Sequence, residues 1–284
     1  MKWTRGGSSQ YIEDRRGQKA RWGGRLGLGT IVIVLAAFLA QRYLGVDIPL
    51  GGLGGGQQQG PAEPIDPAKD PEREVVEFVK FVINDLNATW ERKLAESGKK
   101  YRPAILVLFR DGTSSEACGY GSSAIGPFYC PGDQKAYIDL SFFKMLNDRF
   151  GAPGDFAQAY VLAHEMGHHV QNLLGYEDVM REAQKRDPER KNDLSVRYEL
   201  QADCLAGVWG HASKQRDLLE AGDVEEGMRA AASIGDDTLQ KQGGGKVSPE
   251  SWTHGSSEQR MRWLRRGLES GSVDACETAK TDSL

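Results

Sequence analysis

Two histidines four residues apart are the residues of this chain best suited to chemistry. They occur in His164-Glu165-Met166-Gly167-His168, and side chains four apart lie on one face of a helix. Two imidazoles placed in this way can bind one metal ion, and the glutamate between them can act as a base without being a ligand. The chain has only 5 His among 284 residues, so composition alone is a poor explanation of the pattern. The pattern predicts His164 and His168 as zinc ligands and Glu165 as the general base of a hydrolase.

An amphipathic helix is predicted around this motif, from Asp155 at its N-cap to Gly175 at its end. His164 and His168 lie one residue past buried positions, at the border of the apolar face, where the floor of a cleft is expected. His169 lies on another face and is predicted to support the site or to lie at the surface. The apolar positions, which recur at spacings of four and three, are Phe156, Tyr160, Ala163, Gly167, Val170 and Leu174.

A catalytic zinc ion usually takes three protein ligands and leaves a fourth position for water, so a third ligand is needed. Glu199 is the preferred candidate, in a helix predicted from Asp193 to about His211. Asp203 stands four residues later on the same face and can accept the outer N–H of a ligating imidazole. The alternatives, all in the charged stretch after the helix that carries the two histidines, are Glu177, Asp178 and Glu182.

Three segments carry a resemblance to a known family. They are His164-Glu165-Met166-Gly167-His168-His169-Val170-Gln171-Asn172, Glu199-Leu200-Gln201-Ala202-Asp203-Cys204-Leu205-Ala206-Gly207 and Thr253-His254-Gly255-Ser256-Ser257-Glu258-Gln259-Arg260. Over nearly its whole length the chain resembles the bacterial putative neutral zinc metallopeptidase family. The resemblance implies a zincin-like fold, Zn²⁺ as cofactor, a peptide or protein as substrate, and a third ligand in a Glu-x-x-x-Asp helix. The resemblance thus implies the same third ligand, Glu199, and the same supporting residue, Asp203, as the helical spacing.

Hydrolysis of a peptide bond also needs a hydrogen-bond donor for the developing oxyanion. His254 is the candidate, because a late histidine has this place in related zincins. The alternative for His254 is a turn residue that fixes local structure together with Arg260. Tyr198, beside Glu199, is a second candidate donor.

The remaining pattern predicts an α+β domain over residues 72–284, mostly helical with a small sheet. A helix is expected from near Asp70 to between Thr89 and Ala95, and strands over Tyr101–Phe109 and Ala136–Leu140. A short helix is predicted after the second strand. We expect that strand to form the upper rim of the cleft, where an extended peptide could pair with the sheet edge.

The N-terminal quarter has a different composition. Residues 1–25 carry seven Lys or Arg against two acidic residues, and Leu26–Ala40 has no charge. This predicts a cytoplasmic basic segment (1–25), a transmembrane anchor (26–46) and a Gly-, Gln- and Pro-rich linker (47–71). A cleavable signal peptide is the alternative. We expect a single-pass protein of the bacterial cell membrane, with a cytoplasmic N-terminus and a periplasmic or extracellular catalytic domain.

Cysteine usage and charge agree with this location. An even number of cysteines outside the cytoplasm favours disulfides, and the preferred pairing is Cys118 with Cys130 and Cys204 with Cys276. The net charge of −4 and a pI near 5.8 offer no surface for nucleic acid. Two alternatives to a membrane-anchored zinc peptidase stay open. One is a zinc-bearing interaction or scaffold protein with little activity, and the other is zinc-dependent hydrolysis of a different bond.

Overall fold

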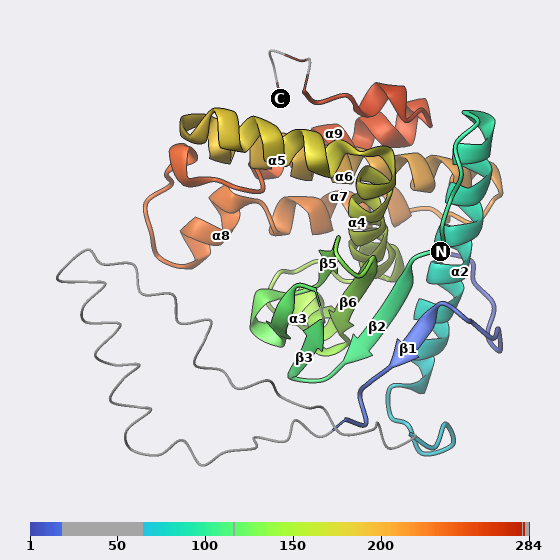
Figure 1. Cartoon of the computed structure of the whole chain (residues 1–284). Coiled ribbons are helices and arrows are strands. Elements are labelled where there is room, and N and C mark those ends of the chain that lie inside the picture. Colours follow the sequence, from blue (N-terminus) through green and yellow to red (C-terminus); the bar gives the residue numbers. More distant parts are fainter. Residues whose placement is uncertain (19–64, 116, 280, 282–283) are drawn as a thin grey trace.

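A small sheet on one side and a layer of helices on the other enclose the core (Figure 1). The computed structural model describes residues 1–18, 65–115, 117–279, 281 and 284. Helices and a small sheet together confirm the predicted α+β class. None of the helices within these residues has the length and continuous apolar character needed to cross a membrane. The predicted anchor over 26–46 and most of the predicted linker over 47–71 lie outside the described residues.

The main sheet has four strands in the order β1-β2-β6-β5. Their bounds are β1 Ile12–Asp14, β2 Ile105–Phe109, β5 Phe128–Cys130 and β6 Lys135–Asp139. β1, β2 and β6 are parallel, and β5 is antiparallel to β6. β2 and β6 are buried along nearly their whole length, as expected for central parallel strands covered on both faces. Both predicted strands are therefore confirmed, although β2 starts four residues later than expected and β6 lies one residue earlier. A separate hairpin joins β3 (Gly112–Ser115) to β4 (Gly119–Ser122).

Eight α-helices lie within the described residues. They are α2 Arg73–Glu96, α3 Ser141–Asp148, α4 Asp155–Leu174, α5 Tyr176–Arg186, α6 Lys191–Gln215, α7 Asp223–Ser233, α8 Asp236–Gln242 and α9 Ser257–Ser270. Short 3₁₀ turns are η2 Ser123–Ile125, η3 Pro188–Arg190, η4 Pro249–Ser251 and η5 Asp274–Cys276. The predicted first helix, the short helix after β6 and the His helix are all present.

α4 is the central element, because it packs on α2, β5, β6, α6 and α7. It ends at Gly175, whose φ of 79° is a left-handed conformation that favours glycine. α4 approaches α6 closely at Gly167, where a Cβ would lie 2.8 Å from the carbonyl oxygen of Ala202. α6 meets α9 in the same way, because a Cβ at Gly267 would overlap the carbonyl group of Cys204. These glycines let the backbones of α4, α6 and α9 lie side by side.

Residues 1–18 pack against the domain that the sequence predicts to start at residue 72. β1 pairs with β2 with Ile12 opposite Leu106, and the buried guanidinium of Arg16 forms ion pairs with Asp14, Asp70 and Glu72. The sequence predicts residues 1–25 as a segment of their own, whereas in the structure residues 12–14 form a strand of the domain's sheet. The basic side chain of Arg16 is neutralised by carboxylates of the domain.

Both predicted disulfides are confirmed. Cys118 pairs with Cys130 beside the hairpin, and Cys204 of α6 pairs with Cys276 of η5, with Cα atoms 5.4 Å apart. The second disulfide closes a separation of 72 residues and joins the segment after α9 to the helix that carries Glu199. It therefore connects the C-terminal part of the chain directly to the predicted metal site.

Candidate metal centre

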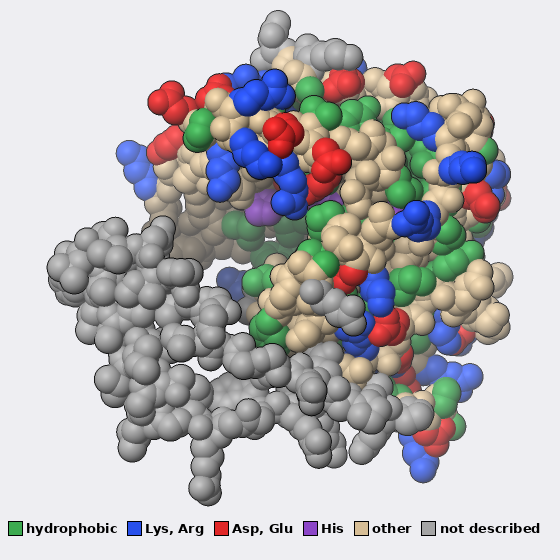
Figure 2. All heavy atoms as spheres, in the orientation of Figure 1, with side chains coloured by type: hydrophobic (Ala, Val, Ile, Leu, Met, Phe, Trp, Pro, Cys, Tyr) green, Lys and Arg blue, Asp and Glu red, His purple; other side chains and the backbone are tan. Residues whose placement is uncertain are grey.

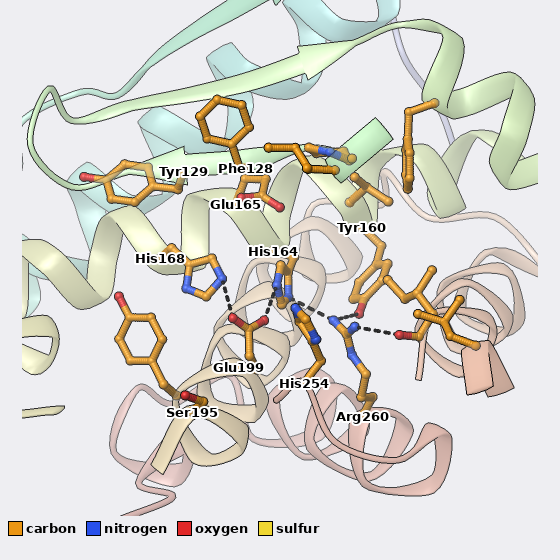
Figure 3. Close-up of a pocket in the computed structure, with 18 of the residues that line it drawn as sticks. Phe128, Tyr129, Tyr160, His164, Glu165, His168, Ser195, Glu199, His254 and Arg260 are labelled. Carbon is orange, nitrogen blue, oxygen red and sulfur yellow. Dashed lines mark hydrogen bonds and ion pairs between the residues drawn. The ribbon is translucent and has the colours of Figure 1, made fainter. Parts of the chain in front are cut away.

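The three predicted ligands converge on one point. His164 and His168 project from α4, and Glu199 projects from α6 (Figure 3). Glu199 Oε2 lies 3.1 Å from His164 Nε2, and Glu199 Oε1 lies 3.5 Å from His168 Nε2. The ligand atoms all lie within 4.8 Å of one another. Two imidazole nitrogens and a carboxylate are a donor set that suits zinc with an open fourth position.

The alternative third ligands lie elsewhere. Glu177 is buried and forms an ion pair with Arg181, one turn later on α5. Glu182 pairs with Lys185 at the surface. Neither belongs to the group of converging ligand atoms. Asp178 is exposed on α5 and does not belong to this group either. The geometry therefore supports Glu199 over all three alternatives.

The surroundings of the site favour a positive charge. Burial disfavours the charged form of His164, yet Asp203 and Glu199 raise the pKa of this imidazole to about 10. Burial likewise acts to raise the pKa of Glu199, but the two histidines hold it well below its usual range. A cation at the point where these groups meet, whether a proton or a metal ion, is thus stabilised. This charge preference and the donor set together fit Zn²⁺.

Asp203 supports His164 from behind. Asp203 Oδ1 lies 2.8 Å from His164 Nδ1, so Nδ1 carries the proton and Nε2 is left as the ligand atom. The same carboxylate accepts hydrogen bonds from Tyr160 Oη and from Arg260, whose guanidinium lies 2.8 Å and 2.9 Å from its two oxygens. Burial opposes ionisation, but Arg260 and His164 lower the pKa of Asp203 to about 2. The carboxylate is therefore charged and fully buried.

His168 has a neutral partner instead. Its Nδ1 donates to Oε1 of Gln171 at 2.8 Å, which again leaves Nε2 for a metal. Tyr198 stacks on the His168 ring, with centroids 5.1 Å apart. Tyr198 therefore lies beside a ligand, as its neighbour Glu199 predicts.

Glu165 lines the cleft without belonging to the group of ligand atoms. It lies on the side of the histidines that faces β5, opposite Glu199 (Figure 3). Burial raises the pKa of the Glu165 carboxyl above its usual value. A carboxylate with a raised pKa is a stronger base than a solvated one, which suits proton transfer.

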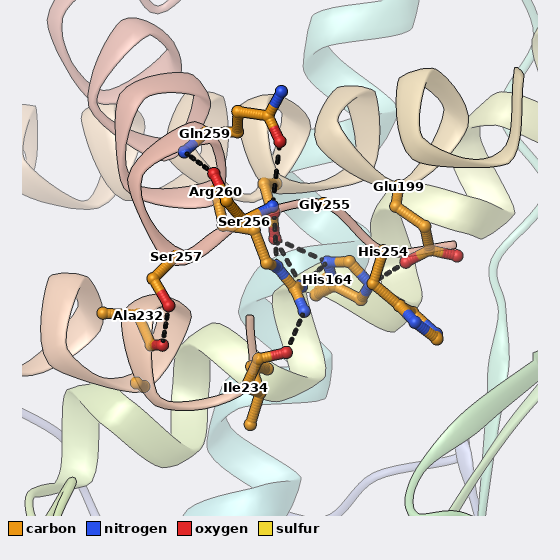
Figure 4. A network of polar contacts seen from close by, with 12 residues as sticks. His164, Glu199, Ala232, Ile234, His254, Gly255, Ser256, Ser257, Gln259 and Arg260 are labelled. Atoms are coloured by element: carbon orange, nitrogen blue, oxygen red, sulfur yellow. Dashed lines mark hydrogen bonds and ion pairs between the residues drawn. The ribbon is translucent and has the colours of Figure 1, made fainter. Parts of the chain in front are cut away.

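His254 lies at the mouth of the cleft with its side chain half exposed. Its backbone N–H donates to Asp236 Oδ2, and its Nδ1 lies 3.3 Å from Asp236 Oδ1. This hydrogen bond is the main cause of the raised pKa of His254. Arg260, which the sequence offers as the local partner of His254, meets Asp203 instead. His254 is thus fixed by Asp236 and stands near the ligands (Figure 4).

The cleft has a volume of about 720 Å³ and separates the sheet side from the helical layer. In Figure 2 histidine side chains are visible at the bottom of a hollow bordered by apolar side chains. β5 contributes Phe128 and Tyr129 to its lining. The expectation that Ala136–Leu140 forms the rim was wrong, because this segment becomes β6, which is paired on both sides with β2 and β5.

His169 does support the site, but from inside the core. It is fully buried, and its Nε2 donates to the carbonyl oxygen of Arg102 at 2.7 Å. Its Nδ1 then accepts from Tyr129 Oη at 3.0 Å. Burial lowers the pKa of His169 to about 4, so the ring is neutral. α4 therefore holds the cleft strand β5 with one face while it presents the ligands on another.

Comparison with known proteins agrees with this geometry. The family model described as putative neutral zinc metallopeptidase matches residues 1–279. The chain belongs to this family. It is 45% identical over 289 residues to the Uncharacterized protein YpfJ of Escherichia coli K12, covering 98% of each chain. It is 41% identical over 212 residues to the Uncharacterized protein Rv2575 of Mycobacterium tuberculosis H37Rv, covering 71% of this chain and 69% of that protein. No solved structure matches this member of the family.

Sequence reasoning missed three buried polar residues around the candidate metal centre. Gln171 lies three residues after His168, so helical spacing alone could have indicated it. Tyr160 was assigned to the apolar stripe, although its hydroxyl contacts Asp203. Arg260 was considered only with His254. Its partner Asp203 is 57 residues away, and no local pattern shows that contact.

Proposed function

We propose that this protein is a zinc-dependent peptidase that hydrolyses peptide bonds. The observation that carries the proposal is the convergence of His164, His168 and Glu199 on one side of a cleft into which Glu165 also projects. A structural zinc site would be closed by a fourth protein ligand, and it would not need a base beside it. The arrangement therefore supports catalysis over a scaffold role.

The residues of the chain have separate tasks in this reaction. Bound zinc supplies Lewis acidity, which polarises a carbonyl group and acidifies water. Glu165 takes the proton of the attacking water and transfers it to the leaving amine nitrogen. His254, whose Nδ1–H is held by Asp236 and whose raised pKa favours the doubly protonated ring, donates from Nε2–H to the developing oxyanion. Asp203 and Gln171 hold the two imidazoles in the tautomer that leaves Nε2 available.

The free side of β5 supports an extended peptide as substrate. β5 is the last strand of the sheet, and within the described residues no further strand pairs with its outer side. A peptide that pairs there gains main-chain hydrogen bonds without regard to its side chains. His169 and Asn172 of α4 form hydrogen bonds with Tyr129 of this strand. These bonds fix the position of the strand relative to the ligands. A peptide bond can thus be placed over Glu165.

The cleft also supports a preference for a large apolar side chain beside the cleaved bond. The lining combines apolar side chains with Glu177 and with Tyr198, which stacks on His168. The apolar lining residues are Ile125, Phe142, Met145, Phe150, Val161 and Leu239. A buried leucine- or phenylalanine-sized side chain contributes about 1.5–3 kcal/mol to binding there.

The two disulfides support activity outside the cytoplasm. Disulfides form and persist in oxidising compartments and are rare in the cytosol of mesophiles. The membrane anchor over 26–46 stays a prediction from the sequence, and the peptidase proposal does not depend on it. Fractionation of cells that express the full chain, followed by thiol labelling of Cys204 and Cys276, tests the location.

Glu165→Gln tests the function. The change keeps the shape of the side chain and removes its basicity, so we expect full zinc content and a loss of cleavage of about 10²–10⁴-fold. Cleavage of a diverse peptide library, analysed by mass spectrometry, is the measurement, with zinc stoichiometry determined in parallel. Glu182→Gln removes an equal charge from an exposed position and serves as the control. Cleavage that persists in Glu165→Gln would exclude this base, and zinc-loaded wild-type protein that cleaves nothing would favour the scaffold alternative.

A further inference from the structure

A chain of buried hydrogen bonds links His168 to a disulfide. His168 Nδ1 donates to Gln171 Oε1 at 2.8 Å, and Gln171 Nε2 donates to Gln201 Oε1 at 2.9 Å. Gln201 Nε2 then donates to the backbone carbonyl oxygen of Cys276 at 3.1 Å. Cys276 is bonded to Cys204. All three hydrogen bonds point from His168 toward Cys276. The orientation of each amide therefore depends on the orientation of the next residue in the series.

The two amides of this hydrogen-bond series have little freedom to find other partners. Gln171 is fully buried and Gln201 is 4% exposed. The second hydrogen of the Gln171 amide goes to the carbonyl oxygen of Tyr198 at 2.7 Å, so both of its N–H groups are used. A buried amide that lost an acceptor would leave a polar group without a partner, at a cost of about 1–3 kcal/mol. The amides are therefore fixed as long as Cys276 stays in place.

The disulfide holds Cys276 at this position. Cys276 lies in η5, a 3₁₀ turn after α9, whereas Cys204 lies in the middle of α6, one residue after Asp203. Both sulfur-bearing residues are buried. Arg197 also holds the following segment, because it donates to the carbonyl oxygen of Thr278 at 2.7 Å. Breaking the disulfide should accordingly loosen the Cys276 carbonyl without releasing the whole segment.

We propose that Gln171 and Gln201 are positioning residues through which the Cys204–Cys276 disulfide sets the affinity of the site for zinc. With the disulfide formed, the series holds His168 Nε2 toward Glu199 and His164. With the disulfide reduced, the Cys276 carbonyl moves, the Gln201 and Gln171 amides can turn, and His168 loses its fixed tautomer. The proposal rests on the proposed metal site but not on peptide hydrolysis. It means that the protein binds zinc tightly only after it has reached an oxidising compartment.

Zinc affinity is the direct measurement. The full chain is titrated with Zn²⁺ in competition with a fluorescent chelator, before and after reduction with tris(2-carboxyethyl)phosphine. In this reduction the phosphine becomes its oxide with oxygen from water, and the two hydrogens of that water end on the thiols of Cys204 and Cys276. We expect the zinc dissociation constant to rise about tenfold, the lower end of what loss of a ligand's hydrogen-bond partner causes.

Two variants assign the effect to this disulfide and to the amides. A Cys118→Ser/Cys130→Ser protein keeps only the Cys204–Cys276 bond, and it should show the same tenfold change on reduction. Gln201→Met keeps both disulfides and interrupts the series of hydrogen bonds. We expect Gln201→Met to bind zinc about tenfold more weakly when oxidised and to show no further change on reduction, since the connection is already broken.

The outcomes separate this inference from the proposed function. Additive losses from Gln201→Met and from reduction would refute the connection through the amides. An unchanged dissociation constant on reduction, with thiol counting showing that Cys204 and Cys276 are free, would refute the role of the disulfide. Wild-type protein that binds no zinc would overturn both proposals. A Cys204→Ser/Cys276→Ser variant that fails to fold does not affect the test, because reduction of the folded protein and Gln201→Met give the answer without it.

Discussion

Replacement of Asp203 by Asn should affect zinc binding and folding to different extents. Asp203 is fully buried, and its carboxylate accepts from His164 Nδ1 and from Arg260 at 2.8 Å each. Asparagine has nearly the same shape, so packing changes little. It has no charge, however, and one of its terminal atoms is a donor instead of an acceptor. Either His164 or Arg260 must therefore lose a partner.

The two losses have different magnitudes. Loss of the charged acceptor behind His164 should weaken zinc binding about 10–100-fold, or about 1.4–2.7 kcal/mol. Loss of the charge opposite Arg260 leaves a buried guanidinium unpaired, since Asp203 is the carboxylate that it contacts within the described residues. Breaking a buried ion pair on one side costs about 3–5 kcal/mol of unfolding free energy. Folding should therefore suffer more than metal binding.

A double variant separates the two effects. Arg260→Met in the Asp203→Asn background removes the unpaired charge, so most of the unfolding free energy should return while zinc binding stays weak. Urea unfolding of the metal-free proteins and chelator competition for Zn²⁺ give the two quantities. Zinc affinity that recovers together with stability would show that Asp203 acts only through the fold. Zinc affinity unchanged in the single variant would refute the orientation of His164 by Asp203.

Three further changes test other parts of the structure. Gly267→Ala should lower the unfolding free energy by at least about 3 kcal/mol in thermal or urea unfolding, because its Cβ would overlap the Cys204 carbonyl and force α9 away from α6. Arg16→Gln should destabilise the protein by about 3 kcal/mol near neutral pH. Burial acts to raise the pKa of Asp70, but Arg16 holds it below its usual value of 3.8. This difference, followed by urea unfolding, should therefore become smaller as the pH falls through the native pKa of Asp70, which is one of the three carboxylates that Arg16 contacts. His254→Ala should reduce kcat about 10²–10³-fold at unchanged zinc content, measured on a peptide found by library cleavage.

The parts of the site that could be predicted from the sequence are those that lie on single helices. The spacing of His164 and His168 fixes their relative direction once α4 forms, and Glu199 and Asp203 are related in the same way on α6. The same reasoning, applied three residues after His168, indicates Gln171. Apolar periodicity and the motif together thus suffice to predict the ligands and the residues one helical turn away from them.

Contacts between distant segments could not be predicted in this way. The sequence predicts residues 1–25 as a separate basic segment and does not show that Arg16 pairs with carboxylates of the domain, because Asp70 and Glu72 lie more than 50 residues later. The role of β5 was missed for a similar reason. Phe128–Cys130 is too short to show alternation, and its place at the sheet edge depends on its pairing with β6.

All three ligands depend on one short stretch of α6. Glu199 belongs to it, Asp203 orients His164, and the Tyr198 carbonyl and Gln201 hold the amide of Gln171 behind His168. This stretch is in turn held by the disulfide at Cys204 and by the close contact of α6 with α9. A perturbation of the contact between α6 and α9 should therefore move the three ligands together and not one at a time. Zinc affinity should then fall in variants such as Gly267→Ala that lie far from the metal, whereas equally destabilising changes in β1 should leave it unaltered.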